Sequence, residues 1–283
     1  MIFDRIAILD WSAANRPRRG KDSIWLGHDS APPENLPTRA TAFDRLTALV
    51  EDALTRNQRL LIGADFAFGY PRGFARALTG QDNALALWQQ LADRLQDDAR
   101  NRSNRLEVAA EINRGLPGLG PFWFNPTKTD LPGLPRKGTT RHGHGFTDLR
   151  VTDRTRGAQS VWKLGGAGAV GSQVLTGLPV LWRLRAAFPG RIAAWPFEPP
   201  APVTLAEVFP SLLAAPVRAA TAAGPVRDAV QVTLLARALA TLDHQGALAP
   251  LLVPPPAPKD EGWILGLGAE AALNAACPPA SWR

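Results

Sequence analysis

The sequence of 283 residues contains a single cysteine, Cys277, close to its end. One cysteine cannot form a disulfide within one chain, and it cannot build a cysteine-based zinc site. No apolar run approaches the roughly 18 residues that a membrane-spanning helix needs. The first residues lead directly into an expected strand rather than into a signal peptide. These absences predict a cytoplasmic protein with no membrane partner.

Two common catalytic motifs are also missing from the sequence. It has no G-x-x-x-x-G-K-[ST] phosphate loop and no G-x-S-x-G nucleophile motif, so neither a P-loop nucleotidase nor a serine hydrolase of that type is indicated. Internal repeats are absent as well. The sequence His142-Gly143-His144 could bind a metal ion, but two histidines in a glycine-rich loop are more often simply solvated.

The composition is that of a globular protein with a positive charge. Hydrophobic residues make up 45% of the chain and charged residues 20%, which allows a sizeable core. The 32 Lys and Arg residues outnumber the 25 Asp and Glu residues, so the formal net charge is +7. A basic balance favours a polyanionic partner, either nucleic acid or a nucleotide. Because the chain is also rich in alanine and proline, a GC-rich genome offers a second explanation of its many arginines.

Residues 1–283 are expected to form one domain built from strands alternating with helices. The length fits one large domain, and the apolar run 6–9 suits a strand buried on both faces. Further strands are expected at residues 22–27, 59–65, 160–164, 191–195, 204–210 and 261–266. Apolar residues at helical spacing predict helices at residues 41–55, 84–99, 172–188 and 225–243. The pattern indicates an α/β fold with a mixed sheet flanked by helices.

Residues 101–159 show no clear periodicity and are rich in proline, glycine and basic side chains. A segment of this length without regular structure is usually functional or disordered. We interpret it as a long basic insertion lying over the active face, where Arg136, Arg141 and its other arginines would contact phosphate groups. The alternative is a mobile surface loop.

Four acidic residues stand at comparable places in the expected elements. Asp10, Asp65 and Glu207 end or nearly end strands, and Asp228 lies in the first turn of a late helix. If the strands are parallel neighbours, these carboxylates meet at one edge of the sheet, where α/β proteins bind ligands. Carboxylates suit Mg²⁺ or Mn²⁺, and two such ions can support phosphodiester hydrolysis. Each acid alone could equally cap a turn or a helix.

This order of acids resembles the RNase H-like (retroviral integrase) superfamily, in which they come from the first strand, the fourth strand and the last helix. More closely, the chain resembles a domain-of-unknown-function family of predicted RNase H-like nucleases. The residues that carry this likeness are 10–12 (DWS), 65–71 (DFAFGYP), 207–210 (EVFP), 227–229 (RDA) and 261–264 (EGWI). The resemblance implies an RNase H-like fold, with Asp10, Asp65 and Asp228 as metal ligands and Glu207 as a fourth acid.

A nucleotide-binding protein or phosphotransferase on the same core is the alternative function. Residues 166–171 match G-x-G-x-x-G, but no acid follows at the spacing of a dinucleotide site. The backbone amides around Gly166 and Gly168 could instead hold a substrate phosphate beside Lys163. Ser12, followed by a basic turn, could hold phosphate on the first hairpin. Similar chains are sometimes labelled molybdopterin guanine dinucleotide synthesis proteins, a link that no motif here supports. The sequence does not indicate an oligomeric state.

Overall fold

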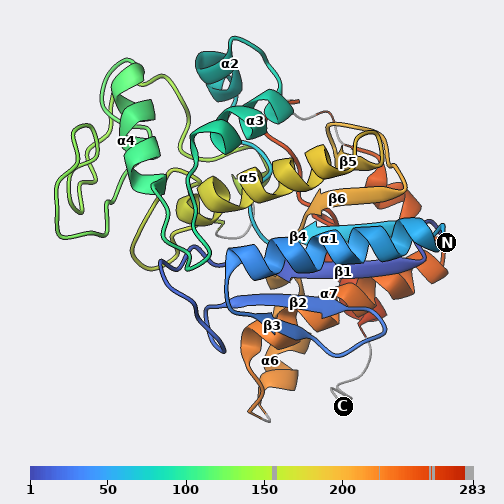
Figure 1. Cartoon of the computed structure of the whole chain (residues 1–283). Coiled ribbons are helices and arrows are strands. Elements are labelled where there is room, and N and C mark those ends of the chain that lie inside the picture. Colours follow the sequence, from blue (N-terminus) through green and yellow to red (C-terminus); the bar gives the residue numbers. More distant parts are fainter. Residues whose placement is uncertain (155–157, 223, 255, 257–258, 278–283) are drawn as a thin grey trace.

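The computed structural model describes residues 1–154, 158–222, 224–254, 256 and 259–277, and it is an α/β structure built on one mixed sheet (Figure 1). Six strands lie in the order β3-β2-β1-β4-β6-β5. Their bounds are β1 Arg5–Asp10, β2 Ile24–His28, β3 Glu34–Leu36, β4 Leu60–Ala64, β5 Ile192–Trp195 and β6 Val203–Glu207. β1, β4, β6 and β5 are parallel, whereas β2 and β3 pair in antiparallel fashion.

Side chains of the central strands alternate between two hydrophobic cores, one on each face of the sheet. In β1, Ala7 and Leu9 enter one core, and Ile6 and Ile8 enter the other. This is the side-chain period of a strand. It explains why the run reads as continuously apolar, because both faces are covered.

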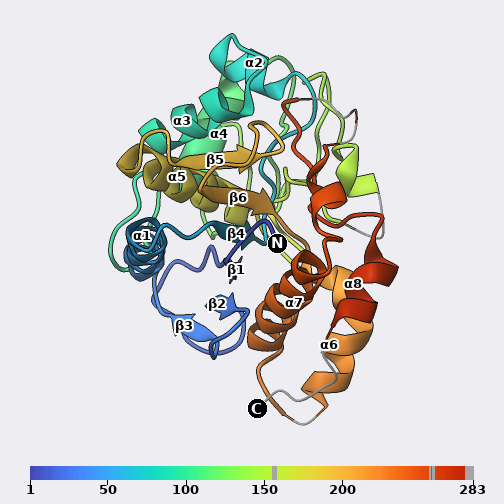
Figure 2. The same cartoon turned by 90° about the vertical axis from the view of Figure 1, so that its right-hand side faces the viewer.

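Helices cover both faces of the sheet, as Figure 2 shows. On one side lie α1 (Arg39–Thr55), α3 (Ala84–Arg94) and α5 (Gly171–Ala187), with α2 (Phe74–Thr79) and α4 (Arg105–Gly115) beyond them. The other side carries α6 (Ala214–Thr221), α7 (Arg227–His244) and α8 (Glu270–Ala276). Short 3₁₀ turns span Thr152–Arg154, Pro210–Leu213 and Ala249–Leu252. Among the helices in the described ranges, none is long and apolar enough to cross a membrane.

Two predicted strands are wrong. Residues 160–164 form turns and one isolated bridge, between Lys163 and Trp123, because Trp162 is drawn into an aromatic cluster instead of a ladder. Residues 261–266 make only one bridge, from Ile264 to Glu207. Glycines 262 and 266 have φ values of +77° and +84°, which are not strand conformations.

The apolar spacing of the sequence did not predict several short elements. β3 has only three residues and lies between prolines. α2, α6 and α8 have six, eight and seven residues. Such lengths give about two helical turns, so a repeating apolar spacing hardly develops.

The predicted insertion 101–159 is more ordered than a plain loop, because it contains α4 and one 3₁₀ turn. Figure 1 shows α4 and the loops around it projecting beyond the sheet. The buried side chains of Phe122 and Leu134 belong to the same hydrophobic core as those of α1 and α5. Residues 155–157, at the end of this segment, lie outside the described residues.

Candidate functional site

The carboxyl ends of the parallel strands bring three of the predicted acids to one edge of the sheet. Leu9 of β1 pairs with Ala64 of β4, and Ala64 pairs with Glu207 of β6. Asp10 therefore ends β1 one position beyond this row, and Asp65 directly follows β4. The Asp65 amide donates a hydrogen bond to the Leu9 carbonyl at 2.8 Å. The expected convergence of the strand-end acids is confirmed by this register.

Asp228 joins the edge from α7, which packs against β1 and β2. Asp228 lies in the first turn of α7, and its Oδ2 accepts a 2.7 Å hydrogen bond from the amide of Asp22. Asp22 belongs to the turn that connects β1 to β2, so this bond ties the helix to the hairpin. We refer to Asp10, Asp65 and Asp228 together as the three-aspartate cluster.

The three carboxyls influence one another electrostatically. Burial raises the pKa of Asp10 well above its usual value, and the charges of Asp65 and Asp228 raise it further. Burial also raises the pKa of Asp65 to about 7, with contributions from Glu207 and Asp228. The pKa of Asp228 is raised mainly by burial. Within the described residues, neither Asp10 nor Asp65 forms an ion pair with a basic side chain. Ionisation of these two carboxyls is thus unfavourable in the absence of a cation.

Glu207 has a different environment from the three-aspartate cluster. Its carboxylate accepts two hydrogen bonds from Arg150, at 2.6 and 2.8 Å, and one from the Phe68 amide at 2.8 Å. Arg150 also binds Asp153 through two 2.8 Å bonds. Burial raises the pKa of Glu207, and the positive charge of Arg150 opposes that rise. The predicted phosphate contact of this insertion arginine is wrong, because its guanidinium is enclosed between two carboxylates.

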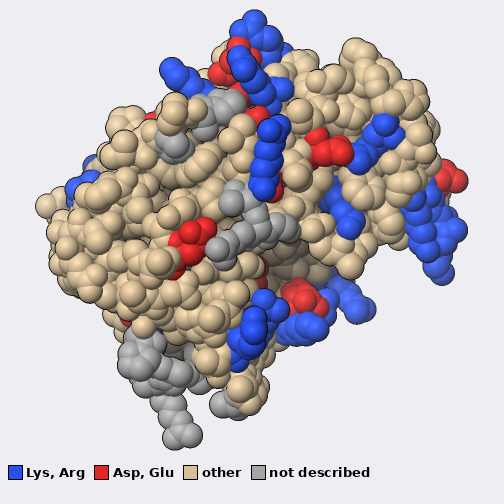
Figure 3. All heavy atoms as spheres, turned by 180° about the vertical axis from the view of Figure 1, so that it is seen from behind, with Lys and Arg blue, Asp and Glu red and all other residues tan. Residues whose placement is uncertain are grey.

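A cavity of about 140 Å³ lies beside Asp65 and Glu207. Gln159 and Gln173 reach its wall, and Arg150 closes part of it. The end of the insertion therefore contacts the edge that carries the acids. Figure 3, which shows the molecule from behind, displays a hollow whose rim carries both basic and acidic side chains.

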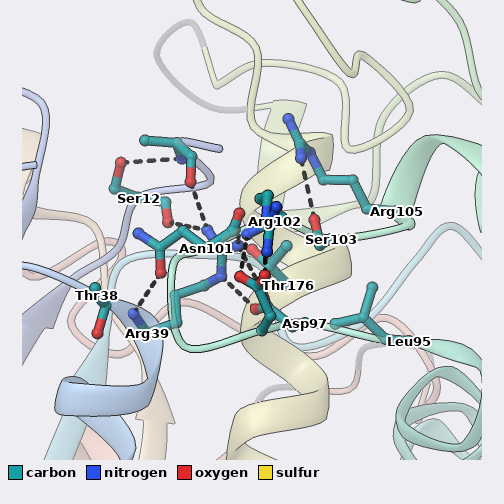
Figure 4. A network of polar contacts seen from close by, with 12 residues as sticks. Ser12, Thr38, Arg39, Leu95, Asp97, Asn101, Arg102, Ser103, Arg105 and Thr176 are labelled. Atoms are coloured by element: carbon teal, nitrogen blue, oxygen red, sulfur yellow. Dashed lines mark hydrogen bonds and ion pairs between the residues drawn. The ribbon is translucent and has the colours of Figure 1, made fainter. Parts of the chain in front are cut away.

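Arg39 fixes the backbone that follows Asp10, as Figure 4 shows. Its side chain is buried and donates to Asp97 at 2.5 and 2.7 Å. It also donates to the carbonyls of Ser12 and Ala14, at 3.2 and 3.0 Å. The Arg39 amide binds the side chain of Asn101 at 2.8 Å. Sequence reasoning missed Arg39, because only its contacts with distant segments distinguish it from other helix-terminal arginines.

Ser12 has a role in holding the hairpin turn. Its hydroxyl donates to the Asp22 carbonyl at 3.0 Å and accepts a 3.4 Å bond from the Ala14 amide. Since Asp22 in turn binds Asp228, Ser12 helps to place α7 against the hairpin. Its predicted contact with substrate remains a prediction.

The predicted phosphate loop leads into α5 but does not follow a strand. Gly166 and Gly168 have φ values of +80° and +70° and are exposed. The amine of Lys163 donates to the Ala167 carbonyl at 2.5 Å, so it bonds within the loop. At Gly171, an added Cβ would collide with the Val161 carbonyl oxygen. This last glycine is explained by close packing.

Arg136 and Arg141 occupy different environments in the insertion. Arg136 is exposed, and its amide binds Asp130 at 2.6 Å. Arg141 forms an ion pair with Asp148, and its guanidinium lies 4.8 Å from the centre of the Trp123 ring. The exposed side chain of Arg136 could contact a phosphate, whereas the guanidinium of Arg141 is already in contact with Asp148 and Trp123.

In the described part of the chain, no three His, Cys, Asp or Glu side chains enclose a metal site in this conformation. The donor chemistry of the three-aspartate cluster nevertheless suits a hard cation such as Mg²⁺ or Mn²⁺. Its carboxyls come from three parts of the fold, and the charge of Asp228 raises the pKa of both Asp10 and Asp65. A bound cation would relieve this repulsion. The fit therefore lies in the donor set, and the side chains must move closer to coordinate an ion.

Comparisons with protein-family models, with curated proteins and with solved structures found no match to this chain. The assignment of a function therefore depends on the residues and on the geometry described above.

Proposed function

We propose that this protein is a Mg²⁺- or Mn²⁺-dependent phosphodiester hydrolase that acts on nucleic acid. The observation that carries the proposal is the three-aspartate cluster at the carboxyl edge of the sheet. Asp10, Asp65 and Asp228 interact through their charges, and the strand-end pair Asp10 and Asp65 has no ion-pair partner among the described residues. Such an arrangement is costly unless a cation or a reaction uses it.

The positions of the acids agree with the resemblance to the RNase H-like superfamily. Asp10 ends β1, Asp65 follows β4, and Asp228 opens α7, the last long helix. One difference is α8, a helix of seven residues that follows α7. The membership itself remains a proposal, supported by the order of the acids and by a mixed sheet with β1 beside β4.

Each residue of the site would have a defined task in this function. Asp10, Asp65 and Asp228 would hold the divalent cation, which when bound supplies positive charge to the phosphate and lowers the pKa of a water. Ser12 and Arg39 keep the chain after Asp10 in place. Glu207 holds Arg150 in place and contributes to the raised pKa of Asp65. The exposed Arg136 would contact the substrate backbone.

The alternative of a nucleotide-binding protein or phosphotransferase receives less support from the glycine loop. The Gly171 amide donates to the Lys163 carbonyl, and the Ala169 amide donates to the Gly166 carbonyl. These two donors are used within the loop, and Lys163 is bonded there as well. No structural feature of the described residues points to molybdopterin guanine dinucleotide.

Cleavage of labelled DNA and RNA, single- and double-stranded, with Mn²⁺ or with a chelator, tests the proposed function. We expect metal-dependent cleavage that falls by more than about 100-fold in Asp10→Asn, because a ligand contributes more than its supporting groups. Asp29→Asn is a matched control at the opposite end of β1, where the Asp29 carboxylate accepts a bond from the Ile6 amide. Undiminished cleavage by Asp10→Asn would refute the assignment, and tight ATP or GTP binding without cleavage would favour the alternative.

A further inference from the structure

The carboxylate of Glu207 has its partners inside the protein, and it shares the positive charge of Arg150 with Asp153. Glu207 and Arg150 are 3% and 1% exposed, so water does not compensate either charge. Both carboxylate oxygens of Glu207 accept hydrogen bonds from Arg150, and one of them also accepts the Phe68 amide. A carboxylate held in this way offers its remaining lone pairs poorly to a cation.

Arg150 is equally committed to its position. Its five N–H groups are all used, by Asp153, Glu207 and the carbonyl of Glu261. Breaking a buried ion pair by removing one partner is strongly unfavourable. The guanidinium is therefore a fixed positive charge at the carboxyl end of β6.

The three-aspartate cluster differs from Glu207 in this respect. Neither Asp10 nor Asp65 has a basic partner in the described part of the chain. Asp228 accepts a backbone amide, that of Asp22. Within the described residues, the edge of the sheet thus has one half near β1 and α7 where no basic side chain pairs with Asp10 or Asp65, and one half near β6 where Arg150 lies between Glu207 and Asp153.

We infer that the site binds one divalent cation, held by the three-aspartate cluster, and that Arg150 takes the place of a second cation beside Glu207. This inference rests on the proposed function and corrects its expected ligand set, because Glu207 becomes a positioning residue. Through its bonds with Arg150, Glu207 holds the insertion against β6.

Titration of the intact chain with Mn²⁺, followed by the electron paramagnetic resonance signal of free Mn²⁺, counts the sites. We expect one site per chain. Glu207→Gln should change its Kd by less than about threefold, whereas Asp65→Asn should weaken it by more than about tenfold. Glu198→Gln is a matched control, since Glu198 also accepts hydrogen bonds from an arginine, Arg185, near the end of a strand.

The possible results separate the inference from the function on which it rests. Two Mn²⁺ sites, one of which disappears in Glu207→Gln, would overturn the inference and leave a metal-dependent function standing. The absence of any site would overturn both. The wild-type stoichiometry already decides between one and two cations if Glu207→Gln fails to fold.

Discussion

At Asp65, burial and two neighbouring negative charges all raise the pKa of the carboxyl group. Burial contributes most to a pKa of about 7, and Glu207 and Asp228 add to it. In the unfolded chain the same carboxyl has a pKa near 4. Between these two values the folded protein keeps a proton that the unfolded chain has lost. The free energy of unfolding should therefore fall as the pH rises from about 4 to about 7.

Asp65→Asn removes this pH dependence. Relative to the wild type, the variant should gain stability on the order of 2 kcal/mol between pH 5 and pH 8 in the absence of divalent cations. Chemical denaturation of both proteins at the two pH values, with a chelator present, measures the gain. If the free energies of unfolding of the variant and the wild type differed by the same amount at pH 5 and at pH 8, the pKa of Asp65 would not be raised in the folded protein.

The side chain of Arg39 connects three segments that are far apart in sequence. It joins α1 to the chain after β1 and to residues 97–101. Replacing one partner of such a buried pair leaves Asp97 as an uncompensated charge. Arg39→Met should therefore lower the free energy of unfolding by about 3–5 kcal/mol.

Arg76→Met is the matched control for Arg39→Met. Arg76 also pairs with an aspartate, Asp82, but both side chains are exposed. Surface pairs of this kind contribute little to stability, so this variant should unfold almost like the wild type. Equal losses in the two variants would contradict the role given to Arg39.

At the scale of elements, α7 lies very close to β2. A Cβ added at Gly27 would lie 2.5 Å from the backbone carbon of Val232 in α7. Gly27→Ala should therefore push α7 away from the sheet and cost about 1–3 kcal/mol. Because α7 carries Asp228, Mn²⁺ affinity should fall as well. Gly115→Ala is the control, since nothing lies within 4 Å of its added Cβ. Unchanged Mn²⁺ affinity in a folded Gly27→Ala would contradict the proposed coupling.

The long elements could be predicted from the sequence because their apolar pattern is set by the sheet itself. β1 and β4 are buried on both faces, and each run of apolar residues is interrupted by an acid, Asp10 at the last position of β1 and Asp65 directly after β4. α7 begins at Arg227, two residues later than the expected start at residue 225. The apolar pattern therefore placed each acid at the end of its element, whereas their meeting at one edge depends on the parallel pairing of β1, β4 and β6.

The parts that were not predicted depend on contacts between distant segments. α4 has apolar side chains at helical spacing, Leu106, Ala109 and Ala110, but the prolines and glycines that follow it obscured that signal. Arg150 and Arg39 look like other arginines in the sequence. Their burial follows from carboxylates that lie 57 and 58 residues away along the chain.

At the scale of the whole molecule, cation binding should stabilise the folded state. A ligand that binds only the folded protein at 100 times its Kd adds about 2.7 kcal/mol. Mn²⁺ should therefore raise the Tm of the wild type in a concentration-dependent manner. Differential scanning calorimetry should show no such rise for Asp10→Asn, while the control Asp29→Asn should respond like the wild type. A similar rise in Asp10→Asn would place the cation elsewhere.

The central claim is that Asp10, Asp65 and Asp228 together hold a divalent cation. Anomalous diffraction from crystals soaked in Mn²⁺ tests it most directly. We expect one strong peak in contact with carboxylate oxygens of Asp10, Asp65 and Asp228, and none on Glu207. Crystals at saturating Mn²⁺ with no peak between these three aspartates would contradict it.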